Sequence, residues 1–169
     1  MATKATSRFG SLLLPLRGYR FVVNRDKRFD PTPFLLRDSS VVSEDQRALR
    51  LTEIDLDTVS FETCLKPGEE AITGEEKYRR HIAAGHVLAD AQIGLMLYQE
   101  EGQKTLEYLY RNGIHDFELL GTRLMYSRED CDRVCILGLF RDIDRWHWEY
   151  FFLDYLPYRQ RPSLVLAGV

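Results

Sequence analysis

The sequence DRWHWEYFFLDY, residues 144–155, places a large aromatic side chain on every second position. Successive side chains of a β-strand point to opposite faces of the sheet, so this spacing predicts a strand. One face would carry Trp146, Trp148, Tyr150 and Phe152. The other would carry Arg145, His147, Glu149, Phe151 and Leu153. We interpret the first face as the buried side of a sheet and the second as its exposed side.

Two apolar runs, residues 117–126 and 133–141, precede this stretch and are joined to it and to each other by short polar connections. Such short connections join antiparallel strands, because parallel strands need a much longer crossover. The middle run is apolar on both faces, so we expect it to be a central strand that helices cover in part. The sequence therefore predicts a C-terminal three-stranded antiparallel meander.

The first predicted helix begins at Thr73. Thr73 and Glu76 have the spacing of a capping box, in which a hydroxyl and a carboxylate satisfy backbone N–H groups that the first turn leaves unpaired. Tyr78 and Ile82 lie four residues apart and would face the core. Gly85 would end the helix in a left-handed conformation.

Two further helices are expected before the meander. Asp90 can cap a helix that turns Ala91, Leu95 and Tyr98 inward, although Gly94 should weaken it slightly. The next helix, residues 104–111, would stop at Asn112 and Gly113. The predicted fold class is therefore α+β, with two or three helices packed on the C-terminal meander.

The N-terminal region gives weaker signals. Strands are possible at residues 18–24 and 34–37, and residues 49–65 alternate in a way that predicts one or two more. Residues 38–47 are polar and predict an exposed loop. With 169 residues, 44% hydrophobic and 29% charged, the chain suits one domain with a substantial core.

Charge is distributed unevenly. Residues 1–28 hold seven basic and one acidic side chain, a net charge of +6, and because the whole chain carries −3 the remainder carries −9. These parts could attract each other. We interpret residues 1–17 as a flexible basic leader and residues 18–169 as a single α+β domain. The alternative is an organellar transit peptide, which is also rich in Arg and Ser and poor in acids.

Composition also limits the partners and the compartment. The net charge and a pI near 5.8 provide no general reason to bind nucleic acid or an acidic membrane. No apolar run is long enough to span a bilayer. Three cysteines, an odd count, argue against a disulfide-stapled secreted domain. We therefore expect a cytoplasmic protein with reduced thiols.

No residue set in the sequence identifies a reaction. The glycine-rich nucleotide loops and the nucleophile elbow are absent. Cys131 and Cys135 would need two more metal ligands from scattered histidines, and His81 and His86 would lie about 140° apart on a helix. We expect no cofactor, no metal and no catalysis. The alternative enzyme would be a metal-dependent hydrolase or nuclease that uses a hairpin containing Asp142, Asp144 and His147.

The exposed face of the aromatic strand is the better candidate for function. Mixed cationic and aromatic surfaces dominate binding hot spots, and the same chemistry continues beyond the strand. The predicted ligand-binding residues are Arg145, His147, Glu149, Phe151, Tyr155, Tyr158, Arg159 and Arg161. The partner would be a protein or another macromolecule. An inhibitor or immunity-type protein that blocks one partner would have the same features.

Several segments resemble a family of small uncharacterised bacterial proteins: LTEIDLD (51–57), FETCLKPGEE (61–70), ITGEEK (72–77), AGHVLADA (84–91), WHWEYFFLDY (146–155) and PSLVLA (162–167). In that family the tail follows W-x-W-x-Y-x-W-L, and the x positions vary. This behaviour resembles that of the variable proteins of diversity-generating retroelements. The resemblance implies a ligand-binding display protein, commonly on a C-type-lectin-like fold.

Adenine-directed mutagenesis in those systems rewrites asparagine codons, and this suggests which residues would vary. His147, Phe151, Tyr155, Tyr158 and Arg161 can all be reached from AAC by changing adenines, whereas Trp146 and Trp148 cannot and would be fixed. Three positions depart from the pattern: Glu149 and Gln160 are not reachable from AAC, and Phe152 replaces the expected tryptophan.

Overall fold

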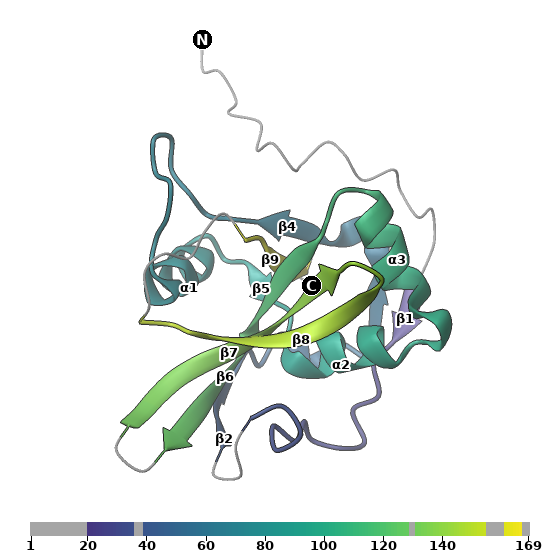
Figure 1. Cartoon of the computed structure of the whole chain (residues 1–169), viewed down its shortest axis with the longest axis horizontal. Coiled ribbons are helices and arrows are strands. Elements are labelled where there is room, and N and C mark those ends of the chain that lie inside the picture. Colours follow the sequence, from purple (N-terminus) through teal and green to yellow (C-terminus); the bar gives the residue numbers. More distant parts are fainter. Residues whose placement is uncertain (1–19, 36–38, 129–130, 155–160, 167–169) are drawn as a thin grey trace.

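Three long strands form the centre of the computed structural model, which describes residues 20–35, 39–128, 131–154 and 161–166. They are β6 (Asp116–Arg128), β7 (Cys131–Asp142) and β8 (Arg145–Phe152). β7 pairs antiparallel with β6 on one side and with β8 on the other (Figure 1). The residues of β7 from 135 to 139 are buried, as expected for a central strand that is covered on both faces.

The sheet is larger than the predicted meander. Within the described residues it has seven strands, and β4 (Ser60–Glu62) and β9 (Ser163–Leu166) extend it in the order β4-β9-β6-β7-β8. β5 (Val87–Leu88) pairs with β9, and β9 runs parallel to β6, which makes the sheet mixed. Neither β5 nor β9 was predicted, because apolar runs of two to four residues show no periodicity that identifies a strand.

The polar segment 38–47 was wrongly predicted to be a loop. It contains β2 (Ser40–Glu44), which pairs antiparallel with β6 so that Ser40 lies opposite Met125. None of the side chains of β2 is buried, so no hydrophobic alternation marks it. The strand proposed at 34–37 is absent at Phe34 and Leu35, which lie in a turn, and its remaining positions fall outside the described residues.

A second, two-stranded sheet joins the N-terminal segment to the domain. β1 (Arg20–Val22) pairs antiparallel with β3 (Glu53–Asp55). Arg20 also forms ion pairs with Glu53 and Asp55. The expected attraction between the basic N-terminal residues and the acidic remainder is therefore present at Arg20, whereas the leader 1–17 lies outside the described residues.

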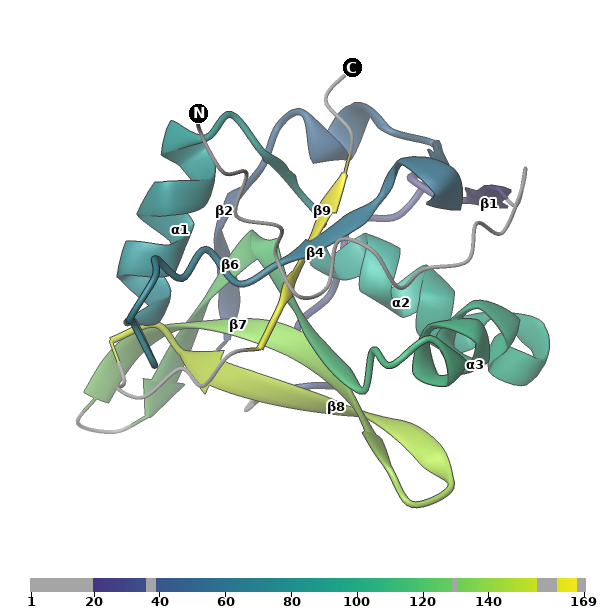
Figure 2. The same ribbon diagram turned by 90° about the horizontal axis from the view of Figure 1, so that it is seen from above.

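The described residues form three α-helices, and the first two begin where their capping residues predict. They are α1 (Gly74–Ala83), α2 (Ala91–Gln99) and α3 (Lys104–Arg111), and short 3-10 turns occur at Ala48–Arg50, Leu56–Thr58 and Glu101–Gln103. The Thr73 hydroxyl accepts the N–H of Glu76 at 3.1 Å, and the Asp90 carboxylate accepts that of Ile93 at 2.9 Å. α1 lies at one end of the molecule and α3 at the other, with strands between them (Figure 2). The domain is thus α+β, and no described helix has the length and apolar character needed to cross a membrane.

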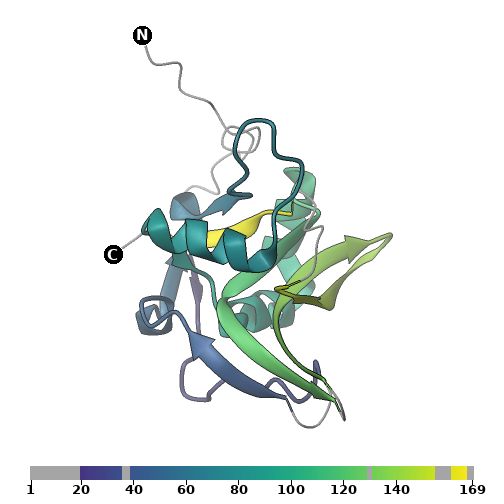
Figure 3. The ribbon, with the colours of Figure 1, turned by 90° about the vertical axis from the view of Figure 1, so that its left-hand side faces the viewer.

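The buried face of α1 differs from the predicted one. Ile82 is 43% exposed, whereas Gly74, Lys77 and His81 are buried. A Cβ on Gly74 would lie 2.7 Å from a side-chain carbon of Leu153, so the helix approaches the end of β8 closely at this glycine. That approach fixes the rotation of α1, whose ribbon crosses in front of β9 in Figure 3, and leaves its lysine and histidine buried.

The hydrophobic core occupies both faces of the central sheet. The largest cluster joins the strands to α2 and α3 and includes Ile93, Leu97, Leu106, Phe117, Leu139 and Trp146. A smaller cluster on another part of the sheet contains Leu88, Leu120, Ile136, Leu153 and Val165. β8 therefore borders packed side chains on both of its faces along part of its length.

Candidate functional site

The predicted binding residues that the structure describes lie on one surface. We call Arg145, His147, Glu149, Phe151 and Arg161 the β8 outer surface. The Arg161 Nη1 atom lies 2.9 Å from the Glu149 carboxylate, and its guanidinium carbon lies 4.4 Å from the centre of the Phe151 ring. Arg161 therefore contacts β8 although it lies twelve positions after Glu149 in the sequence. Tyr155, Tyr158 and Arg159 fall outside the described residues.

Pairing with β7 positions these side chains. His147 lies opposite Phe140, and their rings stack with centroids 5.4 Å apart. Glu149 lies opposite Gly138, and a Cβ on that glycine would be 2.7 Å from the Phe151 ring. The missing side chain at Gly138 therefore lets Phe151 lie across the neighbouring strand.

Exposure varies along the surface. Arg145 is exposed, whereas His147, Glu149, Phe151 and Arg161 are half-buried. Phe151 also packs against the cluster that contains Leu153. The β8 outer surface is therefore a partly packed platform rather than a row of fully solvated side chains.

The alternation predicted for β8 holds at one end and fails at the other. Trp146 is 1% exposed, and Trp148 packs on Phe34 and Tyr98. Tyr150, which was predicted to be buried, is 41% exposed, and Leu153, which was placed on the exposed face, is 1% exposed.

Each of these two residues contacts another strand or helix. Tyr150 stacks on Tyr126, with centroids 5.5 Å apart, and remains 41% exposed. Leu153 is covered by the start of α1 at Gly74. A helix covers the far end of β8 on the face that the sequence pattern assigned to solvent, so alternation alone gives the wrong burial there.

A buried ion pair lies beneath Arg161. The Lys77 Nζ atom lies 2.5 Å from the Glu118 carboxylate and donates to the backbone carbonyl of Arg161 at 2.5 Å. Ser163 donates to the same carboxylate at 3.3 Å. Burial raises the pKa of Glu118, and the charge of Lys77 opposes that change. This network fixes the chain where it re-enters the β8 outer surface, and sequence reasoning missed it because Lys77 was assigned to no buried position.

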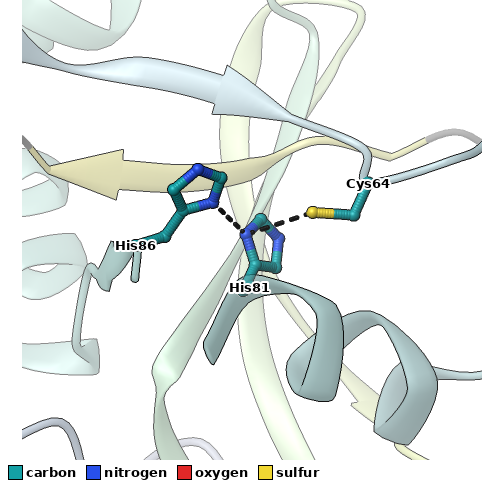
Figure 4. A group of neighbouring side chains, drawn as sticks. All are labelled: Cys64, His81 and His86. Atoms are coloured by element: carbon teal, nitrogen blue, oxygen red, sulfur yellow. Dashed lines mark hydrogen bonds between the residues drawn. The ribbon is translucent and has the colours of Figure 1, made fainter. Parts of the chain in front are cut away.

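A second cluster, Cys64, His81 and His86, was also missed (Figure 4). The Cys64 Sγ atom lies 3.3 Å from His81 Nδ1, which lies 2.9 Å from His86 Nδ1. The angular argument against a histidine pair assumed that both residues lie on one helix. α1 ends at Ala83, Gly85 has φ of +75°, and the chain turns so that the His86 N–H donates to the His81 carbonyl at 3.1 Å.

Burial keeps two groups of the cluster, the His81 imidazole and the Cys64 thiol, uncharged. His81 is completely buried, and burial, with smaller effects of Lys77 and His86, lowers its pKa to about 3. Burial also raises the pKa of the Cys64 thiol, although Lys77 and Arg80 oppose that change. At neutral pH the cluster therefore contains a neutral imidazole beside a protonated thiol.

The other proposed ligand sets do not assemble. Over the described parts of the chain, Cys64, His81 and His86 form the only group of three or more His, Cys, Asp or Glu side chains close enough to hold a metal. Asp142 and Asp144 are exposed in the β7–β8 turn, and the His147 ring stacks on Phe140 instead.

Comparisons of the chain with protein-family models, with curated proteins and with solved structures find no match.

Proposed function

We propose that this chain is a binding protein without catalytic activity, and that the β8 outer surface recognises a protein ligand. The observation that supports this most strongly is the contact of Arg161 with Glu149 and Phe151. It joins Arg161 to β8 and makes one surface from residues that are separated in the sequence.

The chemistry of the surface suits protein recognition. Guanidinium, imidazole, carboxylate and aromatic groups lie side by side, and arginine and aromatic residues are enriched at interface hot spots. The Lys77–Glu118 pair holds the Arg161 backbone before any ligand arrives. Such preorganisation reduces the entropy cost of binding.

The same architecture allows the surface to vary. Trp146 anchors β8 in the core from the opposite face, so substitutions at the exposed Arg145 remove little buried area, whereas substitutions at the half-buried His147 remove its stacking contact with Phe140. Exposed substitutions usually change stability by less than about 0.5 kcal/mol. The resemblance to retroelement variable proteins favours a diversified display protein. Such a protein needs the residues that anchor the strand to be different from the residues that contact the ligand. The C-type-lectin-like fold belongs to the same proposal.

A display library tests the proposal directly. Randomising Arg145, His147 and Glu149 on the surface of yeast should leave most members folded, and selection against lysozyme or ubiquitin should yield specific binders. A control library randomised at Trp146, Leu137 and Leu139 should lose folding instead. Equal loss of folding in both libraries, or no binders from the first, would refute the proposal.

The gene neighbourhood separates a diversified protein from a dedicated inhibitor of one partner. A reverse transcriptase gene beside a near-identical copy of the C-terminal coding segment is the expected arrangement. An inhibitor would instead have close relatives with unchanged residues at 145, 147, 149 and 151, and that result would contradict diversification.

A further inference from the structure

The Cys64–His81–His86 cluster has no part in the proposed recognition surface. Its three potential ligand atoms, one sulfur and two imidazole nitrogens, lie within 4.8 Å of one another. They come from the loop after β4, from α1 and from the turn that follows α1 (Figure 4). Three separate segments of the chain therefore bring their potential ligand atoms together in one cluster.

We propose that Cys64, His81 and His86 bind one zinc ion, through Sγ and the two Nδ1 atoms, with the fourth position open to water or an exogenous ligand. Sulfur and imidazole ligands select zinc and other transition metals over calcium and magnesium. Zinc with three protein ligands and one open position is an established coordination mode.

The spacing of the ligand atoms suits this ion. Tetrahedral zinc, at about 2.3 Å from sulfur and about 2.0–2.1 Å from nitrogen, holds its ligand atoms about 3.3–3.6 Å apart. The observed separations are 3.3 Å between Cys64 Sγ and His81 Nδ1 and 2.9 Å between the two Nδ1 atoms. The two separations that involve His81 would change by a few tenths of an ångström, and Cys64 Sγ and the His86 nitrogen, which lie within 4.8 Å of each other, would have to approach by up to about 1.2 Å.

Hydrogen bonding alone satisfies this cluster poorly. His81 Nδ1 has either one proton or one lone pair, yet both Cys64 and His86 approach it. The buried His81 Nε2 has no hydrogen-bond partner among the described residues. A metal ion would use the lone pairs of all three ligand atoms at once, and it would place the His81 proton on Nε2, which would still lack a hydrogen-bond partner among the described residues.

Two arginines hold the ligand-bearing backbone in place. Arg80 Nη1 donates to the Cys64 carbonyl at 3.0 Å, and Arg80 is itself fixed by Glu69. Arg47 donates to the carbonyl of His86 at 2.6 Å and is fixed by Asp45. Cys64 has φ of +55°, which is uncommon for a residue other than glycine. Supporting contacts of this kind orient metal ligands.

Zinc binding is expected to release one proton from the site. The Cys64 S–H bond breaks, a zinc–sulfur bond forms, and the proton is released to solvent. Neutral His81 donates its Nδ1 lone pair without losing a proton to solvent. Lys77 lies near, but its charge is matched by Glu118. Cys64 and His86 are only partly buried, which leaves a path for the ion.

The test uses the full chain, stripped with EDTA under reducing conditions. Calorimetric titration with zinc alone should show one ion per chain and release of one proton, and zinc should raise the melting temperature. Cobalt should produce a thiolate-to-cobalt charge-transfer band and the intense visible bands of four-coordination. Cys64→Ser should abolish the charge-transfer band and weaken zinc binding by about a hundredfold or more.

Matched variants distinguish a site from general thiol or imidazole binding. His86→Asn should weaken binding as Cys64→Ser does, while the exposed-residue controls Cys131→Ser and His115→Asn should bind zinc like the wild type. Circular dichroism melts without metal establish that each variant is folded. The proposal would be overturned if the wild type did not bind one zinc ion per chain, or if it bound copper but not zinc. It would also be overturned if the control substitutions weakened zinc binding as much as Cys64→Ser does.

Discussion

Lys77 Nζ lies 2.5 Å from Glu118 Oε2 in a part of the core where the lysine is 1% exposed and the glutamate is fully buried. The pair joins α1 to β6, and Lys77 also reaches the Arg161 carbonyl. Removing one charged partner leaves the other buried without compensation. Replacement of both by apolar groups avoids that penalty.

Lys77→Met should therefore destabilise the domain by about 3–5 kcal/mol, the cost of leaving an uncompensated buried charge. The double variant Lys77→Met, Glu118→Leu should recover much of that loss. Urea denaturation measures both. If the double variant is as unstable as Lys77→Met alone, the pair is not the source of the effect.

The helices show how far local sequence signals reach. Thr73 and Asp90 predicted the starts of α1 and α2, because capping chemistry acts within one helical turn. Residues 104–111 match α3, whose end was predicted from Asn112 and Gly113. The buried face of α1 was wrong for a different reason. Gly74, Lys77 and His81 form a stripe that looks polar in the sequence, and only the close approach to Leu153 and the partner Glu118 make it a buried stripe.

The candidate sites divide in the same way. β8 and its tryptophan anchors could be predicted because alternation is local, whereas the burial of Leu153 depends on α1. The Cys64–His81–His86 cluster joins a residue of α1 to one that follows the helix and to one from the loop after β4. A signal was present in Gly85, which turns the chain after α1 and makes the helical angle between the histidines irrelevant.

Gly121 marks a close backbone approach that can be tested. A Cβ there would lie 2.3 Å from the Leu88 carbonyl oxygen and 2.7 Å from the Ala89 backbone. Gly121→Ala should destabilise the domain by about 1–3 kcal/mol or more, since backbone has little freedom to move. Thermal unfolding with a matched denaturant series measures the loss.

Gly94→Ala is the control for that prediction. Its Cβ would lie 2.2 Å from a terminal carbon of the Leu119 side chain, which can change position more easily than backbone, and alanine restores about 1 kcal/mol of helix propensity. We expect Gly94→Ala to cost less than Gly121→Ala. The reverse order would show that the contact between β6 and residues 88–89 adapts readily.

The three cysteines should react with iodoacetamide at different rates. Cys131 is exposed and should be modified first. Cys135 should be modified last, because it is buried and burial raises its pKa to about 11, which leaves little thiolate. Peptide mass spectrometry over time gives the three rates.

Cys64 should react at an intermediate rate after EDTA treatment, because burial raises its pKa and it is only partly accessible. Zinc should protect Cys64 selectively and leave the rate of Cys131 unchanged. Protection of both cysteines would indicate nonspecific thiol binding, and protection of neither would count against the zinc site.

His81 should make the stability of the domain depend on pH. Its pKa is lowered in the folded protein from 6.5 to about 3, so the unfolded chain binds a proton below about pH 6.5 that the folded protein does not bind until about pH 3. The free energy of unfolding therefore contains the full contribution of neutral His81 above pH 6.5. This contribution is lost as the pH falls from 6.5 toward 3. The loss is at most about 1.4 kcal/mol per pH unit for one proton.

The comparison that isolates this effect is wild type against His81→Gln, both with EDTA so that bound metal makes no contribution. Carboxyl groups whose pKa is raised by burial, such as Glu118 and Asp116, act in the opposite direction but are present in both proteins. The stability of the wild type relative to His81→Gln should therefore fall steadily from pH 6.5 to pH 4. Parallel curves from urea unfolding would show that His81 gains its proton in the folded state as readily as in the unfolded chain.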